Sequence, residues 1–146
     1  MTYIHYTDIV KDIKTFFDNH IAVNQFLNIS EADFNANKNV FPAVILVPQP
    51  STFYRNQLNL SFNLVVCDIL TESRDNTKDV YSDTLDIIRD FLAEFTDNPE
   101  LDWGIAENET VTPFEEKYDD ILAGWVLNFN ILVPISLNQC EVPSYI

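Results

Sequence analysis

Acidic side chains are the reactive groups that this chain offers in greatest number. It holds 23 Asp and Glu residues, with close pairs at Glu115–Glu116, at Asp119–Asp120, and between Asp97 and Asp102. Paired carboxylates can act as general acid and base or hold calcium. A small hydrolase built on such a cluster is therefore one hypothesis. The sequence has no Asp-x-Asp-x-Asp-Gly calcium loop, and charged runs in turns usually face solvent.

Other catalytic residue types are scarce. His5 and His20 are the two histidines, without the spacing of a zinc motif, and we expect capping or surface roles for both. No Gly-x-Ser-x-Gly motif is present, and two isolated glycines cannot build a phosphate-binding loop. Cys67 and Cys140 lack metal-ligand spacing, so we expect small buried hydrophobes. The sequence thus predicts a protein that is not an enzyme, with no cofactor and no metal.

Aromatic side chains beside an arginine mark one candidate interaction segment. Phe53, Tyr54 and Arg55 lie in a proline-containing segment, residues 48–57, which we expect to form an extended connection. Aromatic and Arg side chains are enriched at protein interfaces. The alternative is that both aromatic rings fold back onto the core.

A net charge of −15 excludes several classes of partner. Such a chain repels a polyanion, so we expect no direct binding to nucleic acid.

No apolar run approaches the 18 or so residues of a membrane span, and no basic start precedes an apolar stretch. We expect a soluble protein made in the cytoplasm.

The elements that position these residues follow from apolar periodicity. Residues 119–134 read as one long strand that is central to a sheet, with Trp125 to Val133 alternating and Gly124 marking a bulge, a sharp bend or close backbone approach. Helical spacing predicts helices over 7–20, with Ile21 on the apolar face, and from Lys78 to about residue 97. Further strands are expected at 41–47, 58–69 and 101–112, and an acidic turn at 113–120.

This order predicts an α+β fold. Strands that are adjacent in sequence tend to pair as antiparallel hairpins, so we expect an antiparallel sheet of about four strands with two main helices packed on one face. Residues 1–136 should form a single domain, followed by a C-terminal tail at 137–146 that serves as an interaction segment.

The order of elements resembles a family of viral proteins. The run Asp120-Ile121-Leu122-Ala123-Gly124-Trp125, leading into an alternating strand and Pro134, is similar to tail-terminator and head-to-tail connector ring proteins of tailed bacteriophages. The ending from Ile135 to Pro143 resembles versions from phages of Bacteroidetes, including the crAss-like group.

The resemblance implies a non-enzymatic virion subunit that forms a closed homo-oligomeric ring, six- or twelvefold, at the phage neck or tail. Its partners would be copies of itself and adjacent neck, portal or tail-tube proteins. Genomic DNA would pass through an acidic lumen without specific binding. Contacts are expected in residues 48–57, in the acidic segment 107–120 and in the tail, with these candidate interface residues: Phe53, Tyr54, Arg55, Glu115, Glu116 and Tyr145.

A different class of function is also consistent with the charge. An acidic cytoplasmic adaptor, or an inhibitor that mimics nucleic acid, would bind a basic protein one-to-one with a steep dependence on salt.

Overall fold

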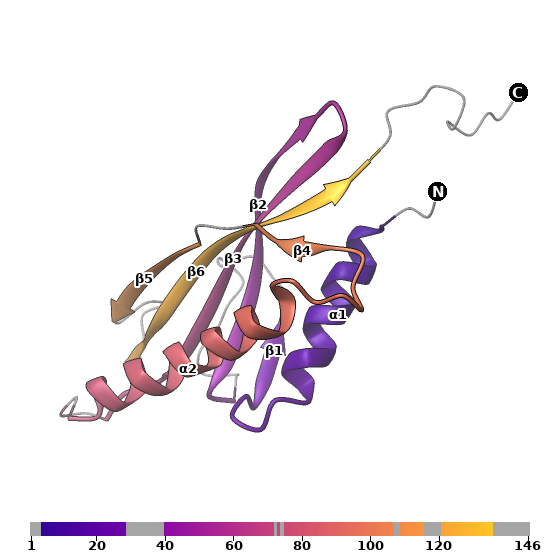
Figure 1. The fold of residues 1–146 in the computed structure, drawn as a ribbon. Coiled ribbons are helices and arrows are strands. Elements are labelled where there is room, and N and C mark those ends of the chain that lie inside the picture. The colour runs from indigo at the N-terminus through magenta and orange to yellow at the C-terminus, as the bar shows by residue number, and fades with distance from the viewer. Residues whose placement is uncertain are drawn as a thin grey trace, which may run out of the picture.

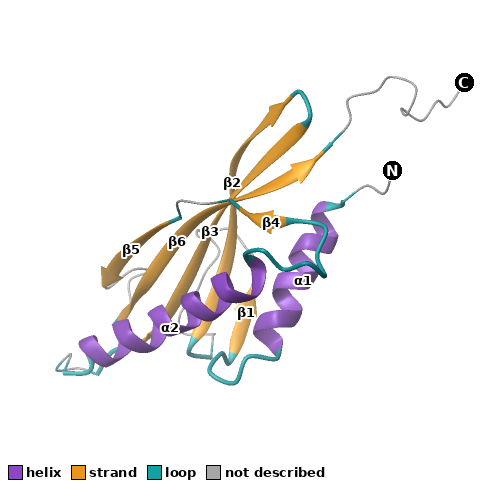
Figure 2. Ribbon diagram, in the orientation of Figure 1, coloured by secondary structure: helices purple, strands orange, loops and turns teal. Residues whose placement is uncertain are grey.

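The computed structural model of the chain describes residues 4–28, 40–71, 73, 75–106, 109–115 and 121–135. Within these residues the fold is α+β, with two helices and a strongly twisted mixed sheet (Figures 1 and 2). The helices are α1 (Tyr6–Asp18) and α2 (Thr77–Phe95). The strands are β1 (Gln25–Leu27), β2 (Ala43–Tyr54), β3 (Gln57–Ile69), β4 (Gly104–Ile105), β5 (Thr110–Glu115) and β6 (Leu122–Pro134).

Strand β6 joins the sheet together because it pairs along its whole length with β3 on one side and with two shorter strands on the other. β3 runs antiparallel to it, from the Ile69–Leu122 pair to the Gln57–Pro134 pair. On its other side β6 pairs with β5 over residues 123–128 and with β4 over residues 131–132. β2 forms a hairpin with β3, and β1 runs parallel to β2 at the edge. The prediction that the long apolar strand is central to a sheet is therefore confirmed.

Both helices pack on one face of the sheet, as predicted. In α1 the buried residues recur every four positions, at Ile9, Ile13 and Phe17, which places them on one side of the helix. The ring of Phe17 stacks on Phe91 of α2 at 5.5 Å, and Phe91 meets Phe129 of β6 edge-on at 5.2 Å. This aromatic row joins the two helices to the central strand.

The opposite face of the sheet carries a second, smaller apolar cluster. Its buried members come from β2, β3 and the start of β6: Ala43, Ile45, Val47, Val65, Cys67 and Leu122. The prediction that Cys67 is a small buried hydrophobe is confirmed, whereas Cys140 lies outside the described residues. Towards the other end of β6 this face becomes polar, and Asn128 donates a hydrogen bond to Asn63 across the strands at 2.9 Å.

The prediction of about four strands, all antiparallel, does not match the structure in two respects. The described residues form six strands, and one of the strand pairs is parallel. β1 adds a parallel strand, and its three residues are too few to show an alternating pattern. The strand expected at 101–112 is instead two short strands, β4 and β5. Residues 113–115, expected in an acidic turn, extend β5, where Pro113 is tolerated because β5 lies at a sheet edge.

The extended connection predicted at residues 48–57 is also wrong. β2 continues to Tyr54 and β3 starts at Gln57, so a tight turn at Arg55 and Asn56 closes a long hairpin. Polyproline and β conformations have similar backbone angles, which is why the two prolines did not distinguish them. Figure 1 shows this hairpin projecting beyond both helices.

Gly124 permits close packing between β3 and β6. A Cβ atom added there would lie 1.9 Å from the carbonyl oxygen of Val66 and 2.9 Å from the Cα atom of Cys67. No side chain can occupy that space without moving the backbone. Among the three roles expected for this glycine, close backbone approach is the one observed.

We predict that Gly124→Ala lowers the free energy of unfolding by about 2–3 kcal/mol, because the added methyl group forces two central strands apart. Gly104→Ala is the matched control, since the nearest atom to its added Cβ, the Phe95 carbonyl oxygen, lies 3.9 Å away. Its effect should stay within about 1 kcal/mol. Urea unfolding of both variants measures the difference, and equal losses would contradict the close approach.

Candidate interaction surfaces

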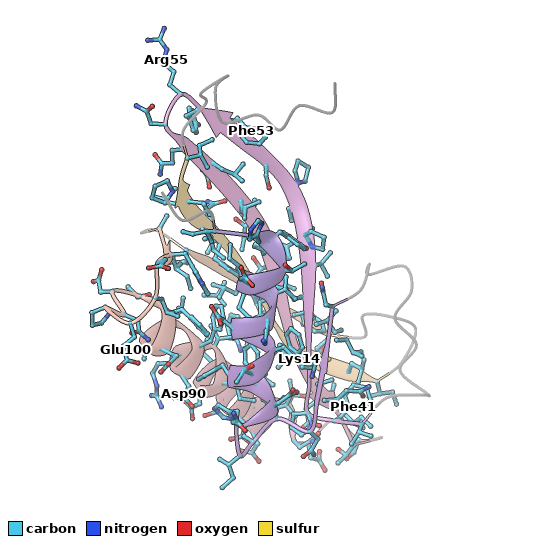
Figure 3. All side chains as sticks on the ribbon, turned by 90° about the vertical axis from the view of Figure 1, so that its right-hand side faces the viewer. Lys14, Phe41, Phe53, Arg55, Asp90 and Glu100 are labelled. Atoms are coloured by element: carbon cyan, nitrogen blue, oxygen red, sulfur yellow. The ribbon has the colours of Figure 1, made fainter. Side chains whose placement is uncertain are left out.

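The end of the β2–β3 hairpin presents three of the predicted interface residues to solvent. Phe53 is 67% exposed and Tyr54 is 58% exposed, and Arg55 in the turn is exposed as well. Figure 3 shows Arg55 and Phe53 at one extreme of the molecule. The alternative that the aromatic rings fold back onto the core is therefore wrong. We call residues 48–61 the hairpin arm.

A β-bulge shapes the hairpin arm. The pairing of β2 with β3 shifts register between Gln49 and Thr52, and Ser51 lies within the shift. The Ser51 hydroxyl donates to the carbonyl oxygen of Gln49 at 3.0 Å and accepts from the backbone N–H of Ser61 at 3.0 Å. This side chain thus supplies the cross-strand hydrogen bond that the bulge would otherwise remove, so the arm stays a paired ribbon.

Charge is distributed very unevenly over the fold. Residues 40–67, which include the whole hairpin arm, contain one charged side chain, Arg55. By contrast, α2 carries exposed carboxylates at helical spacing along its outer face: Asp79, Asp83, Asp86, Asp90 and Glu94. We call these five residues the acidic stripe. The hairpin arm therefore has a net positive charge although the molecule as a whole is strongly anionic.

A groove lies between the end of α1 and the end of α2. Its volume is about 580 Å³, and Phe16, Phe95 and Leu101 supply its apolar lining. The Phe16 and Phe95 rings meet edge-on at 5.5 Å. In the groove lining, Asp12 accepts a hydrogen bond from the indole N–H of Trp103 at 3.1 Å, which holds the loop before β4 against α1.

Ile21 borders this groove and is 98% exposed. The prediction that it lies on the apolar face of the first helix is wrong, because α1 ends at Asp18 and Ile21 falls in the following turn. Sequence periodicity gave no signal for this exposure, since the apolar spacing continues past the true helix end. Ile21 is the interaction candidate that sequence reasoning missed.

His20 has a fixed hydrogen-bonding arrangement. Its Nδ1 accepts a hydrogen bond from the backbone N–H of Ala22 at 3.1 Å. The proton of the ring is therefore on Nε2, which donates a hydrogen bond to the Asp90 carboxylate at 2.9 Å. Both ring nitrogens are occupied by the protein itself. The imidazole therefore joins the end of α1 to α2, a role more specific than the capping or surface role expected for it.

Asp68 lies at the end of β3 beside α2. Desolvation is the main cause that raises the pKa of Asp68 above its ordinary value, and the charge of Asp83 raises it further. The backbone N–H of Ile69, which donates a hydrogen bond to Asp68 at 2.8 Å, lowers this pKa.

Within the described residues no group of three or more His, Cys, Asp or Glu side chains is arranged to hold a metal ion.

The structure does not bring all the predicted interface residues together. Glu115 pairs with Ala123 near the start of β6, whereas the arm lies beside Pro134 at its other end, roughly 35 Å away along the strand. The charge of Glu115 contributes to a raised pKa of Tyr81, with burial as the larger cause. Glu116, Tyr145 and the tail at 137–146 lie outside the described residues.

No protein-family model matches the chain, and no curated protein is significantly similar to it. In the part of the chain that the structure describes, no helix is both long and apolar enough to cross a membrane.

We predict that Asp68→Asn stabilises the protein at pH 7. Folding raises the pKa of Asp68, so the native state is most stable when this carboxyl group is protonated. That stability is fully present below the unfolded-state pKa of about 4 and is lost as the pH rises through the pKa of the folded state. The amide can still accept the Ile69 N–H. Thermal unfolding at a series of pH values should show a higher Tm for the variant at pH 7, and a difference that disappears near pH 4. A difference that does not change with pH would contradict this.

Proposed function

We propose that this chain is a structural subunit of the neck or tail of a tailed bacteriophage, a tail terminator or head-to-tail connector that assembles into a homo-oligomeric ring. The observation that carries the proposal is the hairpin arm, which projects from the domain and ends in two exposed aromatic side chains and an arginine. Exposed aromatic and Arg side chains are the types that most often dominate the energy of protein contacts. The sequence resemblance supplies the particular assembly.

The acidic stripe supports the part of the proposal that concerns DNA. Five exposed carboxylates along α2 would repel phosphate groups if α2 lines the ring lumen. A genome could then slide past without adhering. Neighbouring neck, portal or tail-tube proteins would bind above and below the ring, and the virion would be the site of action. The chain would have no catalytic role.

A second candidate function rests on the acidic stripe alone. A helix with regularly spaced carboxylates offers a basic protein a surface similar in charge to nucleic acid. An adaptor or inhibitor of this kind would form a one-to-one complex whose dissociation constant rises steeply with salt. It would be absent from assembled particles, whereas a ring subunit would be present in several copies in each one.

We predict that the double substitution Phe53→Ser and Tyr54→Ser prevents incorporation into virus particles while leaving the fold intact. Both rings are largely exposed, so the free energy of unfolding should change by less than about 1 kcal/mol. Quantitative mass spectrometry of purified particles measures incorporation. Leu85→Ser on α2, which removes another exposed apolar side chain, is the matched control and should be incorporated normally.

Wild-type protein that never enters particles would contradict the proposed function. Normal incorporation of the double variant would contradict the role of the hairpin arm. Recombinant monomer in dilute solution contradicts neither, because such a ring can require its neighbour for closure.

A further inference from the structure

Copies of this chain repel one another, which limits the surfaces through which they can meet. At a net charge of −15, two acidic surfaces brought together without counter-charge would strongly oppose association. The hairpin arm avoids this penalty because Arg55 is its one charged residue. An acid-free arm on one copy can therefore approach an acidic region on another.

Strand addition is a poor route for this contact. Beyond its pairing with β1, which ends at Ile45, β2 exposes its edge and carries Pro48 and Pro50 there. β5 at the opposite edge carries Pro113. Proline offers no N–H group and interrupts strand addition at sheet edges. Side chains at the end of the arm are thus better suited to the contact than its backbone.

One face of the arm is apolar. Phe53 pairs with Leu58 across the hairpin, and Leu60 lies two residues further along the same face of β3. Leu58 and Leu60 are partly buried, whereas Phe53 is mostly exposed. This strip continues the face that the helices cover in the body of the domain, and it offers an aromatic anchor beside the Arg55 charge.

The groove beside Ile21 has complementary properties. Its volume of about 580 Å³ falls within the roughly 300–1,000 Å³ typical of binding pockets. Phe16, Phe95 and Leu101 provide apolar surface for an aromatic ring. The charged residues of the lining are Lys11, Asp12 and Glu94, so the groove is net negative, and the acidic stripe continues from Glu94 to Asp90.

We propose that the hairpin arm of one copy docks into the groove between α1 and α2 of the next copy, with Phe53 against the apolar lining and Arg55 facing Glu94. Figure 3 shows Arg55 at one end of the molecule and Asp90, which binds the groove residue His20, towards the other. A contact between different surfaces at opposite ends repeats from copy to copy and closes into a ring if the rotation permits. The inference rests on the proposed function in one respect, which is that copies of the chain associate with one another.

Disulfide trapping tests the docking directly. Asn56→Cys places a thiol in the turn of the arm without altering Phe53 or Arg55, and Asn19→Cys places one in the groove lining. A Cys140→Ser background removes the competing thiol, and Cys67 is buried. At about 1 mM protein, where even a millimolar contact is substantially populated, oxidation should give a ladder of cross-linked multimers.

The control pairs Asn56→Cys with Thr110→Cys, an exposed position on β5 away from the groove. It should stay monomeric on a non-reducing gel. A ladder from the arm-and-groove pair but not from the control supports the docking. Equal ladders from both, or none from either, would overturn it.

Charge reversal gives a second, independent readout. Arg55→Glu should weaken self-association by about tenfold, measured by sedimentation at rising protein concentration or by the yield of cross-linked multimers. Adding Glu94→Lys to Arg55→Glu should restore most of that loss. Lys14→Glu makes the same two-unit change of charge on the exposed side of α1 and should have a much smaller effect. If Arg55→Glu weakens self-association and Glu94→Lys does not restore it, Arg55 does not face Glu94 of the next copy, and the proposed pairing is overturned.

The docking and the proposed function fail in different ways. If purified particles contain the protein but the arm-and-groove pair never cross-links, the docking is wrong and the virion role stands. If the ladder forms but particles lack the protein, the docking stands and the virion role is wrong.

Discussion

The pairing of β3 with β6 is the constraint on which the rest of the structure depends. It extends without a register shift over all thirteen residues of each strand, from Gln57 to Ile69 and from Leu122 to Pro134. The helices pack on one face of this pair, and the smaller apolar cluster forms on the other. Because side chains alternate along a strand, a one-residue slip would turn the buried phenylalanines out and the asparagines in. Every surface described above is positioned relative to this ladder.

Two local features keep the ladder in register. Gly124 allows β6 to approach Val66 and Cys67 at a point where no side chain fits. At the other end, the backbone N–H of Ile135 donates to the carbonyl oxygen of Asn56 at 3.1 Å, which ties the end of β6 to the hairpin turn. The hairpin arm is thus an extension of the most continuous part of the sheet, and its position is defined by that sheet.

The sequence predicted the elements with strong periodicity and missed those without it. α2 and β6 were recognisable because their apolar residues repeat over many positions, and the exposed aromatic pair was identified by residue type alone. β1 is three residues long, and β4 is two, so neither could show a pattern. No pattern in the sequence indicated the groove, for another reason. Phe16 lies far along the chain from Phe95 and Leu101, and only the packing of α1 against α2 brings them together.

The bulge between Gln49 and Thr52 changes the alternation of side chains along β2. Before it, even-numbered residues such as Leu46 lie on the side of the sheet that the helices cover; after it, odd-numbered Phe53 lies on that side. Removing one residue there would convert the bulge into a regular pair and leave Phe53 opposite Leu58, on its present side of the sheet. A single-codon deletion at this point could therefore be absorbed during evolution without moving the aromatic anchor or changing the core.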